Sequence, residues 1–293
     1  MARYSIRELE KLSGIKAHTI RIWEKRYNVI QPKRTNTNIR YYSETDLKKL
    51  LNIAILNRQG WKISEIARLH TDDLTDKVMR FTYNSKDVES QIEKLVIAMV
   101  DLDEAKFDHI LSNAIMHDGF EQTIIKLIFP FFEKIGLLWQ TGSINPAQEH
   151  FISNLFRQKL MVAIDNLMIP DKKNASNFIL FLPEEEFHEL GLLFYNYLIK
   201  KAGHSVIYLG GSVPFKDLVE TNKMIQAEYL FTSITTVYTG DKLMAYIQNL
   251  AETFPKQEIF ITGMKVFELS EPLPTNVERI SSPMAFNERL ESL

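Results

Sequence analysis

The amino-acid sequence predicts a multidomain protein of the α and α/β classes, and three observations lead to this prediction. The length of 293 residues exceeds that of a usual single domain. Charge is divided unequally: residues 1–70 hold fifteen Lys and Arg against six Asp and Glu, a net charge of +9, which leaves −11 for the rest. Apolar residues keep helical spacing to about residue 169 and then form short continuous runs typical of strands.

Composition excludes several classes of protein. A hydrophobic content of 45% and a charged content of 25% are ordinary for a globular chain. The sequence has no cysteine, which excludes disulfides, cysteine-bound zinc, iron–sulfur clusters and thiol nucleophiles. It also has no apolar run long enough for a membrane span and no signal peptide, so we expect a cytoplasmic protein without a membrane partner.

The basic N-terminal segment predicts a helix-turn-helix. Ser5 and Glu8 have the spacing of a capping box, and Gly14 ends the short helix that follows. A second helix is expected over residues 18–27. Two short helices joined by a glycine turn are typical of a helix-turn-helix, and the positive charge of the segment would attract the phosphates of DNA.

A β-hairpin wing is expected next, over residues 31–42, followed by a third helix that begins after Ser43. The run from Arg21 to Tyr27, together with Arg40-Tyr41-Tyr42, resembles the MerR-type winged helix over residues 3–70. The resemblance implies binding of double-stranded operator DNA through seven residues: His18, Thr19, Arg21, Arg26, Arg40, Tyr41 and Tyr42. The alternative is a solvated basic helix whose aromatic residues only pack in the core.

Residues 71–90 are polar and mixed, which indicates a domain boundary, and the apolar spacing from 88 to 169 predicts a four-helix bundle. Interruptions are expected at 101–103, 117–119 and 141–143. Trp139 ends one helix, and Pro146 opens the next, with Glu149 and His150 in its first turn. Packing and the helix dipole alone would explain a buried Trp, an N-terminal Glu and a surface His.

Four apolar runs follow, at residues 178–182, 205–209, 229–233 and 259–262, with amphipathic segments between them. This alternation predicts a doubly wound parallel α/β sheet, which binds ligands at the carboxyl ends of its strands. The residues expected at that rim are 183–191, 210–212, 233–236 and 263.

The rim resembles the cobalamin-binding Rossmann-like fold. In that family a His after the first strand is the lower axial ligand of cobalt; His188 matches it, Gly191 matches the family's Gly, and Glu186 stands where the family has Asp. The resemblance further implies that Gly210, Ser233 and Gly263 bind the cofactor, although Ser233-Ile-Thr and Thr-Gly263 keep only part of the family's motifs. Without a cofactor, His188 would be an ordinary residue near a helix start.

The Trp139 to Glu149-His150 spacing is similar to a signature of CarH/LitR-type light-sensing regulators. That resemblance implies that the helical bundle caps the upper face of adenosylcobalamin. It also implies a homo-oligomeric repressor, a dimer or tetramer, that leaves its operator on illumination. Gln140 stands where some members have a His that captures cobalt after photolysis.

Three domains are therefore expected: a winged helix at 1–75, a four-helix cap at 76–172 and a Rossmann-like domain at 173–293. The predicted protein is a regulator and not an enzyme. Two alternatives stay open. One is a regulator on the same scaffold that answers to another signal or partner without cobalamin, and the other is a corrinoid methyl-transfer subunit, against which the basic winged helix argues.

Overall fold

The computed structural model describes residues 4–35, 37–70, 73–75, 77–78, 87–139, 145–170 and 172–293; for residues 137–139 it describes the backbone alone. The chain divides into two compact units, Met1–Leu155 and Phe156–Leu293. The boundary lies within the helix α10 (Pro146–Asp165). None of the described helices is long and apolar enough to cross a lipid bilayer.

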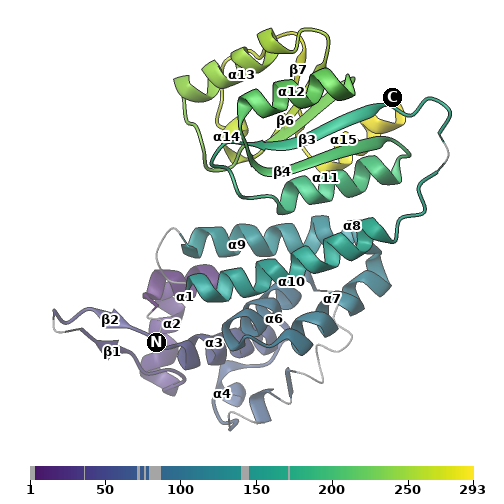
Figure 1. The fold of residues 1–293 in the computed structure, drawn as a ribbon. Helices are drawn as coiled ribbons and strands as arrows, with labels where there is room; N and C mark the ends of the chain where they lie inside the picture. The colour runs from purple at the N-terminus through teal and green to yellow at the C-terminus, as the bar shows by residue number, and fades with distance from the viewer. Residues whose placement is uncertain are drawn as a thin grey trace. The chain divides into compact units, whose positions relative to one another are not determined.

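The first unit begins with the predicted helices and hairpin (Figure 1). Its first elements are, in order, α1 (Ile6–Ser13), α2 (Ala17–Tyr27), β1 (Lys33–Arg34), β2 (Arg40–Tyr41), α3 (Glu44–Arg58) and α4 (Ile63–Ile66). The predicted capping box of Ser5 and Glu8 is confirmed, and Ser43 forms a second one with Asp46 at the start of α3. Gly14, at φ 69°, makes the left-handed turn after α1 that glycine adopts without steric cost.

The hairpin is anchored to the start of the chain. Its two strands pair antiparallel, with Arg34 opposite Arg40. Immediately after β2, the backbones of Tyr42 and Tyr4 exchange two hydrogen bonds, of 2.9 and 2.8 Å. The base of the hairpin is therefore fixed to the start of the chain.

The elements described after α4 in the first unit are all helices. They are α6 (Val88–Asp101), α7 (Glu104–Asp118), α8 (Phe120–Thr123), the π-helical η1 (Ile124–Ile128), α9 (Phe129–Trp139) and the first half of α10. The interruptions predicted at 101–103 and 117–119 are confirmed, at Leu102 (φ 55°) and Gly119 (φ 78°). The one predicted at 141–143, and much of the predicted boundary at 71–90, lie outside the described residues. The π turn precedes Pro130, whose ring nitrogen has no hydrogen to donate within a helix.

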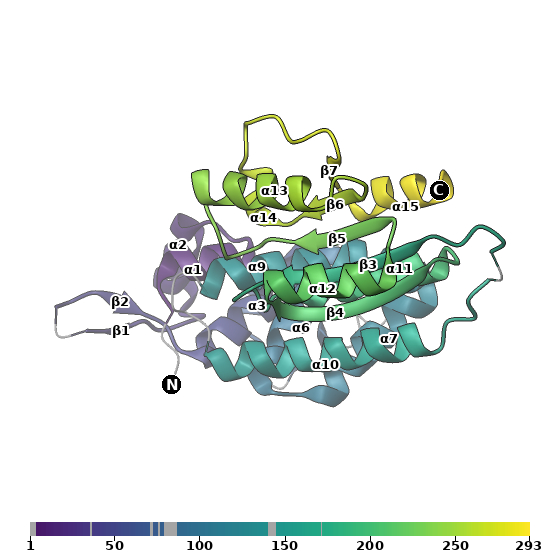
Figure 2. The ribbon, with the colours of Figure 1, turned by 45° about the horizontal axis from the view of Figure 1, so that its top comes forward.

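The second unit is a five-stranded parallel sheet in the order β4-β3-β5-β6-β7 (Figure 2). Its elements along the chain are β3 (Asn177–Pro183), α11 (Leu190–Lys201), β4 (Ser205–Val213), α12 (Phe215–Ile225), β5 (Tyr229–Ser233), α13 (Asp241–Thr253), β6 (Glu258–Thr262), α14 (Met264–Phe267), β7 (Val277–Arg279) and α15 (Pro283–Glu291). The predicted multidomain α and α/β fold class is confirmed.

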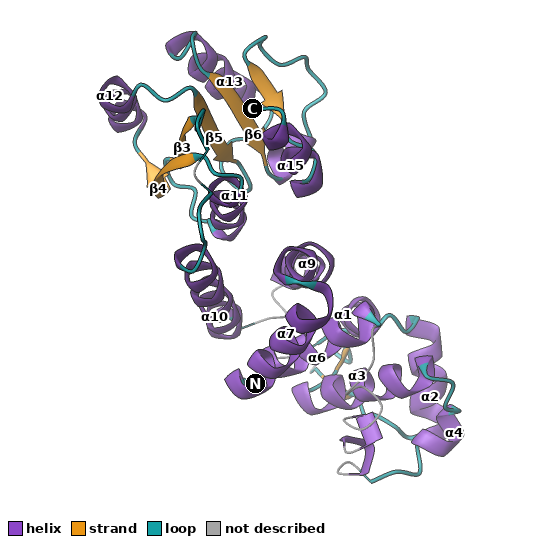
Figure 3. Ribbon diagram, turned by 90° about the vertical axis from the view of Figure 1, so that its right-hand side faces the viewer, coloured by secondary structure: helices purple, strands orange, loops and turns teal. Residues whose placement is uncertain are grey.

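Helices cover both faces of the sheet, which explains why its strands are continuous apolar runs (Figure 3). One face packs against α12 and α13 and buries Ile179 and Ile259 completely. The other packs against α11 and α15, where the rings of Tyr195 and Phe286 lie 4.4 and 5.0 Å, between centroids, from that of Phe231. Hydrophobic burial on two sides therefore holds the rim in place.

Two strands differ from the sequence prediction. β4 continues four residues past position 209. In this extension Gly210 (φ 79°) and Ser212 (φ 52°) adopt left-handed conformations, and the register against β3 shifts, as at a β-bulge. β7 was not predicted, since its three residues are too few to produce a recognisable apolar period.

Candidate functional site

The first candidate site is the basic surface of α2 and the hairpin. His18, Arg21 and Arg26 are exposed on α2, and Thr19 is partly exposed. Arg40 is exposed on β2. These positions are consistent with the DNA contacts expected from the sequence, because cationic groups reach solvent from both the helix and the hairpin.

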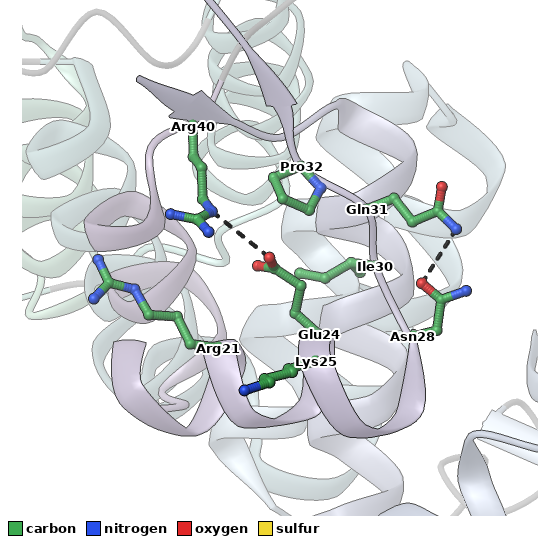
Figure 4. A pocket seen from close by; sticks show the side chains of 8 residues that line it. All are labelled: Arg21, Glu24, Lys25, Asn28, Ile30, Gln31, Pro32 and Arg40. Carbon is green, nitrogen blue, oxygen red and sulfur yellow. Dashed lines mark hydrogen bonds and ion pairs between the residues drawn. The ribbon is translucent and has the colours of Figure 1, made fainter. Parts of the chain in front are cut away.

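A concavity of about 410 Å³ lies between α2 and the hairpin (Figure 4). It is lined by Arg21, Glu24, Lys25, Asn28, Ile30, Gln31, Pro32 and Arg40. The structure thus brings the predicted residues Arg21 and Arg40 together. The other five predicted residues do not line the concavity. One of them is Arg26, whose guanidinium carbon lies 5.4 Å from the centroid of the Tyr27 ring.

Tyr42 differs from the other predicted DNA contacts. Its side chain is fully buried, and its hydroxyl donates a 3.0 Å hydrogen bond to Oε2 of Glu24. Tyr41, by contrast, is partly exposed. We therefore assign Tyr42 to support of the hairpin and keep DNA contact as a prediction for the remaining six residues.

Sequence reasoning missed Glu24 and Lys25 as members of this surface. Both could have been found from helical spacing, because residues three and four positions after Arg21 lie on the same side of a helix. Gln31 and Pro32 could not, since the path of the segment after α2 brings them to the concavity.

The second candidate site lies at the carboxyl end of β3. Glu186 is fully buried, and its Oε1 lies 2.6 Å from Nδ1 of His188. The other carboxylate oxygen accepts hydrogen bonds from the backbone amides of Thr235 and Thr236, at 2.9 and 2.7 Å, in the loop after β5. The imidazole of His188 is 59% exposed, so the ring is held from inside and is accessible from outside.

These contacts keep Glu186 ionised. Burial by itself would raise the pKa of this carboxyl, but the hydrogen bonds from His188 and from the amides of Thr236 and Thr235 outweigh it and hold the pKa far below its usual range. An ionised carboxylate only accepts hydrogen bonds, so Nδ1 of His188 is the nitrogen that carries the proton toward Glu186. A metal bound to this ring would therefore bind through Nε2.

Four further predicted residues follow this pair along the chain. Gly191 lies in the first turn of α11, where an added Cβ would meet no described heavy atom within 4 Å. Gly210 lies inside β4, and Ser233 is the buried last residue of β5. Gly263 has φ 107°, and a Cβ there would lie 2.4 Å from the carbonyl oxygen of Ile234, so the fold itself requires glycine at this position.

The predicted residues Trp139, Glu149 and His150 belong to the first unit. α9 is described as far as Trp139, whose side chain lies outside the described part of the structure, as does all of Gln140. α10 begins at Pro146, which places Glu149 in its first turn. The carboxylate of Glu149 accepts a hydrogen bond from the hydroxyl of Ser153 and lies 2.9 Å from Nδ1 of the exposed His150.

One contact near His188 was not predicted. Arg157 of α10 forms an ion pair with Glu189, the residue after His188, and the hydroxyl of Tyr208 on β4 donates a 3.3 Å hydrogen bond to the same carboxylate. Arg157, Glu189 and Tyr208 are 19 or more positions apart in the sequence, so no local sequence pattern connects them.

Comparison with known proteins matches two segments of the chain to family models. Residues 4–72 match the MerR HTH family regulatory protein model, and residues 91–163 match the B12 binding domain model. The chain joins a MerR helix-turn-helix domain to a B12-binding domain. The matched B12-binding residues include Glu149 and His150, and the predicted family resemblance is confirmed.

Relatives extend the similarity over most of the chain. The HTH-type transcriptional repressor CarH of Myxococcus xanthus is 25% identical, with 86% of each chain covered. The repressor CarA of the same organism is 26% identical over 88% of this chain and 86% of its own. The HTH-type transcriptional regulator MlrA of Escherichia coli is 29% identical over 26% of this chain and 31% of its own. All three are transcriptional regulators by name.

Among solved structures, the monomethylamine corrinoid protein of Methanosarcina barkeri covers 71% of this chain and 100% of its own, with a TM-score of 0.53 and 16% identity. At this identity the likeness supports the fold alone. The N-terminal match to a MerR domain argues against the alternative of a methyl-transfer subunit.

Proposed function

We propose that this protein is a cobalamin-dependent transcriptional repressor that binds operator DNA with adenosylcobalamin bound and releases it on illumination. The observation that carries the proposal is the Glu186–His188 pair, a buried carboxylate that orients an accessible imidazole, in a chain with a MerR helix-turn-helix domain. The protein would act in the cytoplasm as a homo-oligomer.

The residues at the carboxyl end of β3 fit a cobalt ligand. His188 would bind cobalt through Nε2, and Glu186 would orient the ring and raise its basicity, as carboxylates do for many metal-bound histidines. The glycine in the first turn of α11 supports the same proposal: nothing in the described protein explains Gly191, whereas a bulky planar cofactor would need the space. Bound adenosylcobalamin would supply a cobalt–carbon bond that light can cleave.

The remaining predicted ligands contribute unequally to the argument. We propose that Trp139, Glu149 and His150 serve the upper ligand, on the strength of the sequence resemblance and the family match over residues 91–163. Gly210 and Ser233 would contact the nucleotide tail. Gly263 is weak support, since its backbone conformation already requires glycine.

The first experiment is an absorption spectrum of the full-length chain reconstituted with adenosylcobalamin in the dark. We expect the wild-type protein to retain the cofactor after gel filtration with the spectrum of a His-ligated corrinoid. His188→Ala should lose that spectrum, and His117→Ala, which removes an exposed His of α7, should keep it. A wild-type protein that stays colourless would instead support a regulator that works without cobalamin.

The second experiment tests the light response. Operator fragments selected from random DNA by the dark, cofactor-loaded protein would be measured by mobility shift before and after illumination. We expect illumination to weaken binding of the wild-type protein and to leave the cofactor-free protein unchanged. Equal binding before and after illumination would refute the light response while leaving cobalamin dependence intact.

A further inference from the structure

A carboxylate in the middle of the basic surface needs an explanation. Glu24 lines the concavity together with Arg21, Lys25 and Arg40 (Figure 4). A negative charge at this place repels phosphate and lowers the attraction that the surrounding cations provide. Electrostatics alone therefore disfavours Glu24 on a surface that binds DNA.

A buried residue holds one oxygen of the Glu24 carboxylate by a hydrogen bond. Its Oε2 accepts the 3.0 Å hydrogen bond from Tyr42, which is fully buried and joined to Tyr4 through the backbone. Burial, and next the hydrogen bond to Glu24, raise the pKa of the Tyr42 hydroxyl, so it remains a donor throughout the physiological range. Glu24 thus has one oxygen fixed by a rigid partner.

The other oxygen faces the hairpin. Oε1 of Glu24 lies 3.7 Å from Nε of Arg40, whose side chain is 43% exposed. Because the contact is made at Nε, it does not use the four N–H donors of the two terminal nitrogens. Arg40 lies on a two-residue strand, so its backbone alone gives the long side chain little restraint.

We propose that Glu24 is a positioning residue that, held by Tyr42, orients the guanidinium of Arg40 toward a DNA phosphate. This inference deepens the proposed function and rests on its DNA-binding part. Because the arginine side chain is already ordered in the free protein, less conformational entropy is lost when the complex with DNA forms. The gain in phosphate contact then exceeds the repulsion from one partly buried carboxylate.

Glu24 can affect DNA affinity in two opposite ways: its charge weakens binding by repelling phosphate, whereas positioning of Arg40 strengthens it. The full-length chain would be loaded with adenosylcobalamin and kept in the dark. Its binding to a labelled 30-base-pair duplex of arbitrary sequence would be followed by fluorescence anisotropy across a series of KCl concentrations. If charge alone matters, Glu24→Gln binds as tightly as wild type or more tightly. If Glu24 positions Arg40, the Glu24→Gln variant binds DNA roughly tenfold more weakly than wild type at low salt, which is about the effect of losing one charge-assisted hydrogen bond.

Salt dependence separates positioning from a general structural effect. Loss of one phosphate contact lowers the slope of log K against log salt by about 0.9. We expect this decrease for Arg40→Ala and for Glu24→Gln, with no further decrease in the double variant. Glu44→Gln, which removes a carboxylate at the start of α3, should keep the wild-type slope.

Tyr42→Phe provides a second variant if Glu24→Gln lowers the melting temperature. It keeps the buried ring and both charges and removes only the hydrogen bond to Glu24, so we expect a smaller loss of affinity in the same direction. If Glu24→Gln keeps the wild-type affinity and salt slope while Arg40→Ala shows a reduced salt slope, the positioning role of Glu24 is overturned and the proposed DNA binding stands. A wild-type chain that does not bind the duplex would refute the proposed DNA binding and the inference with it.

Discussion

A buried carboxylate between two helices of the first unit leads to a prediction about stability. Glu93 of α6 is fully buried and forms an ion pair with Arg58 at the end of α3, which also lies 3.6 Å from Asp87. Oε1 of Glu93 has no hydrogen-bond partner among the described residues. Burial raises the pKa of Glu93 to about 7, and the neighbouring Arg58 only partly opposes this.

The sign of the effect follows from proton binding. Between pH 4.5 and 7 the folded chain keeps the Glu93 proton that the unfolded chain has lost, so stability from this group is complete below pH 4.5 and decreases as pH rises through 7. The difference between the two pKa values corresponds to about 3 kcal/mol. The side chain of the Glu93→Gln variant stays neutral at every pH. At pH 8 the free energy of unfolding of this variant should therefore exceed that of wild type by about this amount, whereas at pH 4 the two free energies should be equal.

Urea unfolding followed by tryptophan fluorescence is the appropriate assay. The three tryptophans, at positions 23, 61 and 139, all belong to the first unit, which contains Glu93. Glu89→Gln, at the exposed end of the same helix, is the matched control and should change stability by less than about 1 kcal/mol. The reasoning fails if Glu93→Gln is less stable than wild type at pH 8, or if both proteins show the same pH dependence.

Three further predictions concern the candidate cofactor site. Glu186→Gln should weaken cobalamin binding by roughly 10- to 100-fold, because the neutral amide orients His188 less firmly; equilibrium dialysis would measure this, and unchanged affinity would contradict it. Gly263→Ala should destabilise the second unit by at least about 2 kcal/mol in a thermal or denaturant melt, since its Cβ would meet the Ile234 carbonyl and φ is 107°. Gly191→Ala meets no such obstacle, so it should keep or raise stability by up to about 1 kcal/mol and yet weaken cofactor binding; a stability loss like that of Gly263→Ala would disprove the assignment of Gly191 to the cofactor.

Both capping boxes and the four long strands could be predicted because they depend on residues close together in the sequence. Ser5 and Glu8 cap a helix through contacts three positions apart, and an apolar run such as 178–182 needs only its own composition to indicate a buried strand. The basic character of residues 1–70 follows from counting charges. His188 was predicted from the resemblance of the segment after the first strand to the cobalamin-binding fold, and its role as a ligand stays a prediction.

The tertiary structure decided which partners these residues have. Glu186 accepts hydrogen bonds from backbone amides 49 and 50 positions away. Because every residue except proline has a backbone amide, the residue types do not show which amides will be donors. Tyr42 matched a DNA-binding motif, yet the bridge to Tyr4 turns it into the core, where it holds Glu24. Glu93 lies among apolar residues of α6, and only the packing of α3 against that helix provides Arg58 as its partner. Local periodicity determines the elements, whereas burial and pairing of charge depend on contacts between distant segments.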